Sequence, residues 1–167
     1  MFGLNFVFFA HTMNIAEIGF NPTLNQILIS LAELAYVPFA FFFVNNIKRK
    51  LTSIIALLAM CIFSIITYFI IVPPNCELCS QVYFQMTFIL LTRFLVMGQY
   101  SLSIINFNEA YPVSILAIAA GWLGTLSTVG ATLSYIIFSD VSQVGINPFL
   151  LSGILFLMLG ASYIWIP

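Results

Sequence analysis

Long apolar runs separated by short polar turns dominate this chain. They span residues 2–19, 24–44, 51–72, 81–107, 113–138 and 147–166. Most are close to the roughly 20 residues that a helix needs to cross a bilayer. They lack the alternation of apolar and polar positions that is typical of outer-membrane strands. The pattern predicts an all-α membrane protein, with six transmembrane helices in one domain over residues 1–167.

Composition supports this prediction and excludes other classes. Of the 167 residues, 62% are hydrophobic and 5% are charged, whereas a soluble domain has about 25% charged residues. We therefore expect a multi-pass integral protein of the plasma membrane or of an organelle membrane, with the lipid bilayer as its first partner. Four basic residues cannot form a surface for nucleic acid. With so few charges, their positions carry more information than their sum.

The most informative charge lies in the middle of the fourth run. Arg93 is the only charged residue between Gln81 and Phe107, and at about 1.5 Å per residue it lies near midmembrane. A guanidinium there costs roughly 2.5–3.5 kcal/mol on insertion scales, so we expect it to face a protein-lined or watery cavity. Two interpretations stay open: Arg93 binds an anionic substrate group, or it forms a structural pair with a carboxylate.

The second run also contains an internal charge. Glu33 lies near its centre, and Pro38 follows about one turn later. Both features need partners that lipid cannot supply, which indicates a helix that borders a cavity. Glu33 is either a cation or proton site, or a neutral carboxyl group bonded to a neighbouring helix.

The basic residues predict the orientation of the chain. Three of the four, Lys48, Arg49 and Lys50, lie together in the turn after the second run. The positive-inside rule places this turn in the cytoplasm. Counting spans from there puts both termini on the cytoplasmic side, and the turns at 73–80 and 140–147 on the other side.

A second cytoplasmic turn follows the long fourth run. Glu109 lies there, three residues before the helix-stopping Pro112. We expect Glu109 to act as a structural latch that accepts bonds from backbone amides or from the basic turn at 48–50.

The distribution of polar residues suggests an internal repeat. Runs one, two, four and five carry the internal polar positions, whereas runs three and six contain no ionisable residue. We expect the last two to be peripheral and the other four to surround a central space. The fifth run has small residues on one helical face, which predicts close helix packing: Ala117, Gly121, Gly124, Thr128 and Ala131. The order predicts two three-helix units with equivalent roles.

Four short motifs occur along the chain at a characteristic spacing from one another. They are Phe6 to Phe9 with Asn14, Asn25-Gln26 through Glu33 to Pro38, the turn at 48–50, and Arg93 followed by Asn108 to Pro112. Together they resemble the C-terminal half of the major facilitator superfamily, and within it the organic cation/anion transporter family. The chain departs from that family's pattern at Asn45 and Lys48, which weakens the expected cytoplasmic gating contacts. It also departs at Leu116 and Thr128, which leaves the charge of the substrate undecided.

The resemblance implies one half of a twelve-helix secondary transporter that moves organic ions or other small polar solutes by alternating access. It implies substrate contacts from Arg93, Glu33, Phe8 and Phe9. The other candidates for the cavity are Tyr36, Tyr100, Trp122 and Thr128. The turn at 48–50, with Glu109 and Pro112, would serve cytoplasmic gating or structure. The chain would then be a fragment that needs an N-terminal six-helix half, or a half that assembles with a partner subunit.

Enzymatic chemistry is not expected. The sequence shows no nucleophile with a base, no phosphate loop, no cofactor motif and no metal cluster. Cys76 and Cys79 form a CxxC pair that we interpret as a loop disulfide or two idle thiols, and Cys61 as a packing residue. One alternative function stays open, a non-transporting six-helix subunit of a multi-subunit complex such as a respiratory one. Arg93, Glu33 and His11 would then be structural or belong to a proton path.

Overall fold

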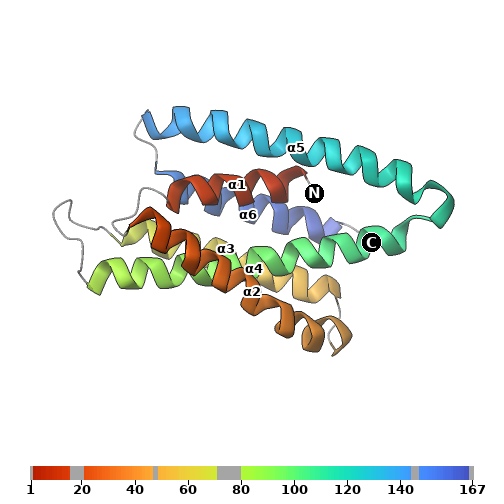
Figure 1. The fold of residues 1–167 in the computed structure, drawn as a ribbon, viewed down its shortest axis with the longest axis horizontal. Coiled ribbons are helices and arrows are strands. Elements are labelled where there is room, and N and C mark those ends of the chain that lie inside the picture. Colours follow the sequence, from red (N-terminus) through yellow and green to blue (C-terminus); the bar gives the residue numbers. More distant parts are fainter. Residues whose placement is uncertain (1, 16–20, 47–48, 71–79, 144–146, 166–167) are drawn as a thin grey trace.

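The computed structural model describes residues 2–15, 21–46, 49–70, 80–143 and 147–165, which form six helices and their turns. The helices are α1 (Phe2–Ile15), α2 (Pro22–Asn46), α3 (Arg49–Phe69), α4 (Ser80–Ala110), α5 (Val113–Gln143) and α6 (Pro148–Trp165). Each predicted run coincides with one of them, and these residues contain no strand. The helices alternate in direction, so that the turns after α2 and α4 lie at the same end of the bundle (Figure 1).

Local signals explain where several helices begin and end. The side-chain oxygens of Asn21 and Asn147 accept hydrogen bonds from backbone amides two residues later, at 3.1 and 3.0 Å. In both cases a proline follows the asparagine and occupies the first helical position, where its missing N–H costs nothing. The α4 helix continues to Ala110 and ends just before Pro112. Helix α2 continues through Pro38.

Among the residues that the structure describes, three helices are long and apolar enough to cross a membrane. They are Arg49–Phe69, Ser80–Ala110 and Val113–Phe138. Within α6, Pro148–Ser162 is a shorter apolar helix. The all-helical fold and its capacity to span a membrane several times are therefore shown.

The packing of the helices follows an internal two-fold pattern. Helix α1 packs against α5 and α6, and α4 packs against α2 and α3, while α3 and α6 pack against each other. Exchanging α1 with α4, α2 with α5 and α3 with α6 leaves this set of contacts unchanged. The first three helices and the last three thus occupy equivalent places. In Figure 1 the α3–α6 pair lies behind α1 and α4, and α2 and α5 lie at opposite edges.

The apolar core lies where α1, α3, α4 and α6 meet. Leu57, Met60 and Phe156 are fully buried there, beside Val96 of α4. Cys61 is buried in the same cluster, in the packing role that the sequence predicts. Helix α3 therefore does more than face lipid: one side is buried against α4 and α6, and the opposite side exposes a row of apolar residues.

The small-residue face of α5 is not closely packed within this chain, so that prediction is wrong for the described residues. A Cβ atom added at Gly121 or Gly124 would meet nothing within 4 Å. The close approach occurs instead at Gly130, where a Cβ would lie 2.7 Å from the backbone oxygen of Phe2. The reason is that α1 is short and contacts α5 only over part of its length, so no described helix covers the region around Gly121.

Candidate functional site

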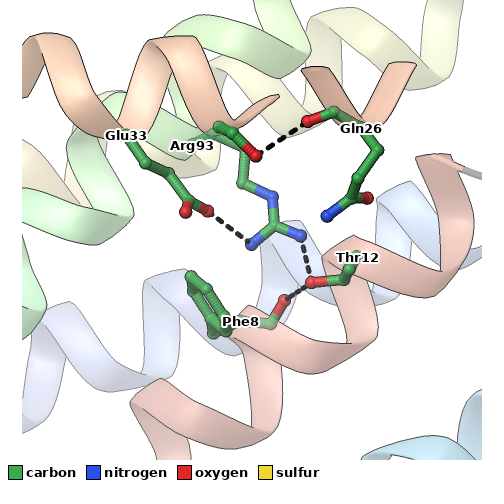
Figure 2. Close-up of polar contacts among 6 residues, drawn as sticks. Phe8, Thr12, Gln26, Glu33 and Arg93 are labelled. Atoms are coloured by element: carbon green, nitrogen blue, oxygen red, sulfur yellow. Dashed lines mark hydrogen bonds and ion pairs between the residues drawn. The ribbon is translucent and has the colours of Figure 1, made fainter. Parts of the chain in front are cut away.

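Arg93 is the centre of a polar cluster between α1, α2 and α4 (Figure 2). The residue is fully buried, with 0% of its surface exposed. Its Nη2 group donates a hydrogen bond to the hydroxyl of Thr12 in α1. That hydroxyl donates its own proton to the backbone oxygen of Phe8 at 2.9 Å, and so its oxygen can accept the bond from the guanidinium.

A carboxylate of α2 balances the charge of Arg93. The Nη1 atom lies 3.8 Å from Oε1 of Glu33, which is an ion-pair distance but too long for a hydrogen bond. The Glu33 side chain is 24% exposed, whereas that of Arg93 is 1% exposed. Nε and Nη1 of Arg93 have no hydrogen-bond partner among the described residues. The pair therefore compensates the buried charge while leaving donor groups of the guanidinium unsatisfied.

The ring of Phe8 completes this cluster and connects it to a pocket. The Arg93 Cζ atom lies 4.5 Å from the centre of the ring, a cation–π contact that helps to hold a desolvated guanidinium. Phe8 in turn meets Phe9 edge to face, with ring centres 5.4 Å apart. Both phenylalanines also line the pocket described next.

A pocket of about 350 Å³ lies between α1, α4 and α5, within the range that is usual for small-molecule sites. Its wall combines aromatic rings with amide and hydroxyl groups, from Asn5, Phe8, Phe9, Tyr100, Ser127 and Thr128. Four of the eight residues predicted to bind substrate, Phe8, Phe9, Tyr100 and Thr128, are thus brought together. Arg93 and Glu33 are not part of this wall, although Arg93 contacts the ring of Phe8, which is.

Two predicted aromatic residues lie elsewhere. Tyr36 is buried between α2 and α4, where its hydroxyl donates to the Gly98 backbone oxygen at 3.4 Å and its ring packs against Phe94. A Cβ at Gly98 would lie 2.7 Å from the Tyr36 ring, so the glycine makes room for it. Trp122 is 70% exposed on α5. Neither residue is part of the wall of this pocket, so their role as cavity residues stays a prediction.

At one end of the bundle an ion pair joins the two turns. Arg49, at the start of α3, donates to the Glu109 carboxylate near the end of α4. This is a contact between Glu109 and the basic turn, as expected for a latch. The two side chains are 35% and 59% exposed, and ion pairs in contact with solvent contribute little to stability. Lys48, Cys76 and Cys79 lie outside the described residues, as does the side chain of His11.

Several residues of the site were not found by sequence reasoning. Thr12 and Asn5 are single polar positions in an apolar run, and the sequence offers no sign of which way they face. Outside the pocket wall, Gln99 of α4 is fully buried six residues after Arg93, and neither atom of its amide has a hydrogen-bond partner among the described residues. A buried amide is costly inside a membrane, so a glutamine within an apolar run was a signal that sequence reasoning could have used.

Comparison of the chain with known protein families and with curated proteins gives no match. The geometry of the site must therefore support the functional argument by itself.

Proposed function

We propose that this chain forms one six-helix half of a major-facilitator-type transporter and moves organic ions or other small polar solutes by alternating access. All six helices would cross the membrane, with the turn after α2 in the cytoplasm. A second six-helix half would complete the bundle. The observation that carries the proposal is the pocket between α1, α4 and α5, which adjoins a buried ion pair through Phe8.

The equivalent packing of the two helix triplets supports the proposal. Three-helix units with equivalent contacts are the repeat plan of transporters whose solute sites lie at the repeat interface near midmembrane. Here α1 and α4 are equivalent by their contacts, and both contribute to the pocket and to the polar cluster. The site thus lies where the two units meet.

The exposed helices support a further partner. Helices α2 and α5 expose many large apolar side chains, including Leu34 at 67%, Ile118 at 67% and Trp122 at 70%. Lipid would cover them in a single half, whereas a second half would cover those that face it. Within the proposal, Arg93 and Glu33 lie beside the pocket as a close pair of opposite charges, and Phe8 contacts Arg93 and lines the pocket.

Uptake into membrane vesicles that contain the protein together with its second six-helix half tests this function. Ala131 lines the pocket, so Ala131→Trp should fill it and abolish uptake of radiolabelled solutes from a panel of organic anions, cations and neutral polar molecules. Ile118→Trp, at an exposed position of the same helix, is the matched control and should keep parental uptake. If no solute in the panel accumulates above protein-free vesicles, or if both variants transport equally, the proposal is wrong. A folded, inserted protein without uptake would favour the non-transporting subunit.

A further inference from the structure

The wall of the α1–α4–α5 pocket is mostly apolar, with a few polar groups and no charge. Its described lining residues include an amide at Asn5, hydroxyl groups at Tyr100, Ser127 and Thr128, and two phenylalanine rings, with no acidic or basic side chain among them. A charged ligand that enters such a site loses its hydration and gains no counter-charge. The wall therefore disfavours ions, whichever sign they carry.

The neighbouring ion pair does not change this balance. Arg93 is not part of the pocket wall, and its Cζ atom lies 4.5 Å from the centre of the Phe8 ring, which is part of that wall. Its positive charge is offset by Glu33 at 3.8 Å. Because the two charges are close and opposite, the field that they exert on a ligand beyond the ring is that of a dipole and falls off faster than that of a single charge.

Asn5 is the group that points to a particular ligand. The residue is only 8% exposed and lines the pocket, yet it makes no hydrogen bond to any described residue. A buried amide normally has partners for both its donor and its acceptor. Thr128 cannot serve as a donor, since its hydroxyl already donates to backbone oxygens of α5 at 2.8 and 3.0 Å. An amide-like group on a ligand would satisfy the oxygen and the nitrogen of Asn5 together.

The aromatic rings define the remainder of the ligand. Phe8 and Phe9 meet edge to face and both line the pocket, with Tyr100 from α4 in the same wall. Such a set of rings favours a flat, apolar ring system in the ligand. We propose that this pocket binds an uncharged, planar aromatic molecule that carries an amide-like group, with the amide paired to Asn5. The inference rests on the proposed function, since it narrows the class of solute that the transporter would carry.

Three probes with the same ring test the charge preference. Benzamide, benzoate and benzamidinium share a phenyl ring and a planar head group, but are neutral, negative and positive at pH 7. Binding of radiolabelled benzamide to the purified full chain in detergent is measured at equilibrium, with the two ions as competitors. Benzamide should bind saturably, and each ion should compete at least tenfold more weakly. If either ion competes as well as benzamide, or if benzamide does not bind saturably to folded protein, the inference is wrong.

Variants test the place of binding. Asn5→Leu should weaken benzamide binding at least tenfold, since a site built to hydrogen-bond a group discriminates strongly once the partner is lost. Ala131→Trp should block binding by filling the pocket without touching Asn5, and it keeps the test decisive if Asn5→Leu does not fold. Ser30→Ala, at an exposed position on α2, is the control and should bind as the parent does. Parental affinity in both folded pocket variants would overturn the assignment.

The outcome also separates this inference from the transport proposal. Saturable benzamide binding without uptake into vesicles would leave the pocket assignment standing and remove the transport function. Uptake that prefers ions, and that Ala131→Trp blocks, would leave transport standing and overturn the neutral ligand.

Discussion

Removing the carboxylate of Glu33 should expose how the buried guanidinium is tolerated. In Glu33→Gln, Arg93 keeps its bond to Thr12 and its contact with Phe8, but loses the charge that lies 3.8 Å away. Breaking a fully buried pair costs about 3–5 kcal/mol. Because Glu33 is 24% exposed and not hydrogen-bonded to Arg93, we expect a smaller loss, about 2–3 kcal/mol of unfolding free energy.

The converse change should be milder. Arg93→Met removes the fully buried charge, replaces it with an apolar chain of similar length, and leaves Glu33, whose side chain is 24% exposed. Because the group left without a partner is the less buried of the two, we expect a loss below about 1 kcal/mol for Arg93→Met. In the double variant Glu33→Gln/Arg93→Met the cost of Glu33→Gln should disappear. The predicted coupling between the two positions is therefore about 2 kcal/mol, within the range for directly interacting residues.

Cys61 offers a probe for this measurement, since it is buried in the core beside Leu57 and Met60. In a background with Cys76→Ser and Cys79→Ser, the rate at which a thiol reagent modifies Cys61 reports how often the core opens. A loss of 2–3 kcal/mol corresponds to a roughly 30- to 140-fold faster reaction, at about 1.4 kcal/mol per factor of ten.

The control for reagent access is Cys61→Ala, which should not react. If Glu33→Gln reacts at the parental rate, or if the two substitutions add without coupling, Glu33 does not compensate Arg93 and the interpretation of the cluster is wrong.

Three other predictions concern packing, the latch and orientation. Gly130→Ala should destabilise the protein by about 1–3 kcal/mol, because the added Cβ would lie 2.7 Å from a backbone oxygen of α1. Gly121→Ala should be neutral or slightly stabilising, because its Cβ would meet nothing within 4 Å. Equal thermal stability of the two variants would contradict the packing of α1 against α5. The swap Arg49→Glu/Glu109→Arg should restore the small stability that either single reversal loses, and the effect should shrink at high salt. A swap that is less stable than both single variants would argue against the ion pair. Cys76 should react with an impermeant thiol reagent in intact cells, and reaction only after permeabilisation would reverse the predicted orientation.

Sequence reasoning predicts the helices well because the bilayer sets their length. Every apolar run became a helix, and Arg93 was identified because a charge at midspan is rare enough to be informative. Pairing of Arg93 with a carboxylate was one of two open interpretations. The sequence could not identify Glu33 as the partner, because Glu33 lies 60 residues earlier on another helix. Nothing in the sequence indicated that Thr12 contacts Arg93, because this contact depends on the place where α1 crosses α4.

The directions of side chains were predicted poorly, and the reason is physical. In a soluble helix the apolar face marks the core, but in a membrane the faces toward lipid and toward protein are both apolar. Tyr36 and Trp122 were therefore equivalent in the sequence, although one is buried between helices and the other is 70% exposed. Gly121 and Gly130 were likewise indistinguishable until the position of α1 along α5 was known.

The accessibility of the pocket from the two sides of the membrane tests the central claim most directly. Ser127 lines the pocket, and Ser127→Cys in a background without the native cysteines places one thiol there. Alternating access predicts that an impermeant thiol reagent modifies this cysteine in right-side-out vesicles and also in inverted vesicles, and that a bound solute slows both reactions. Modification from one side only, with the same rate whether solute is present or absent, would contradict the account.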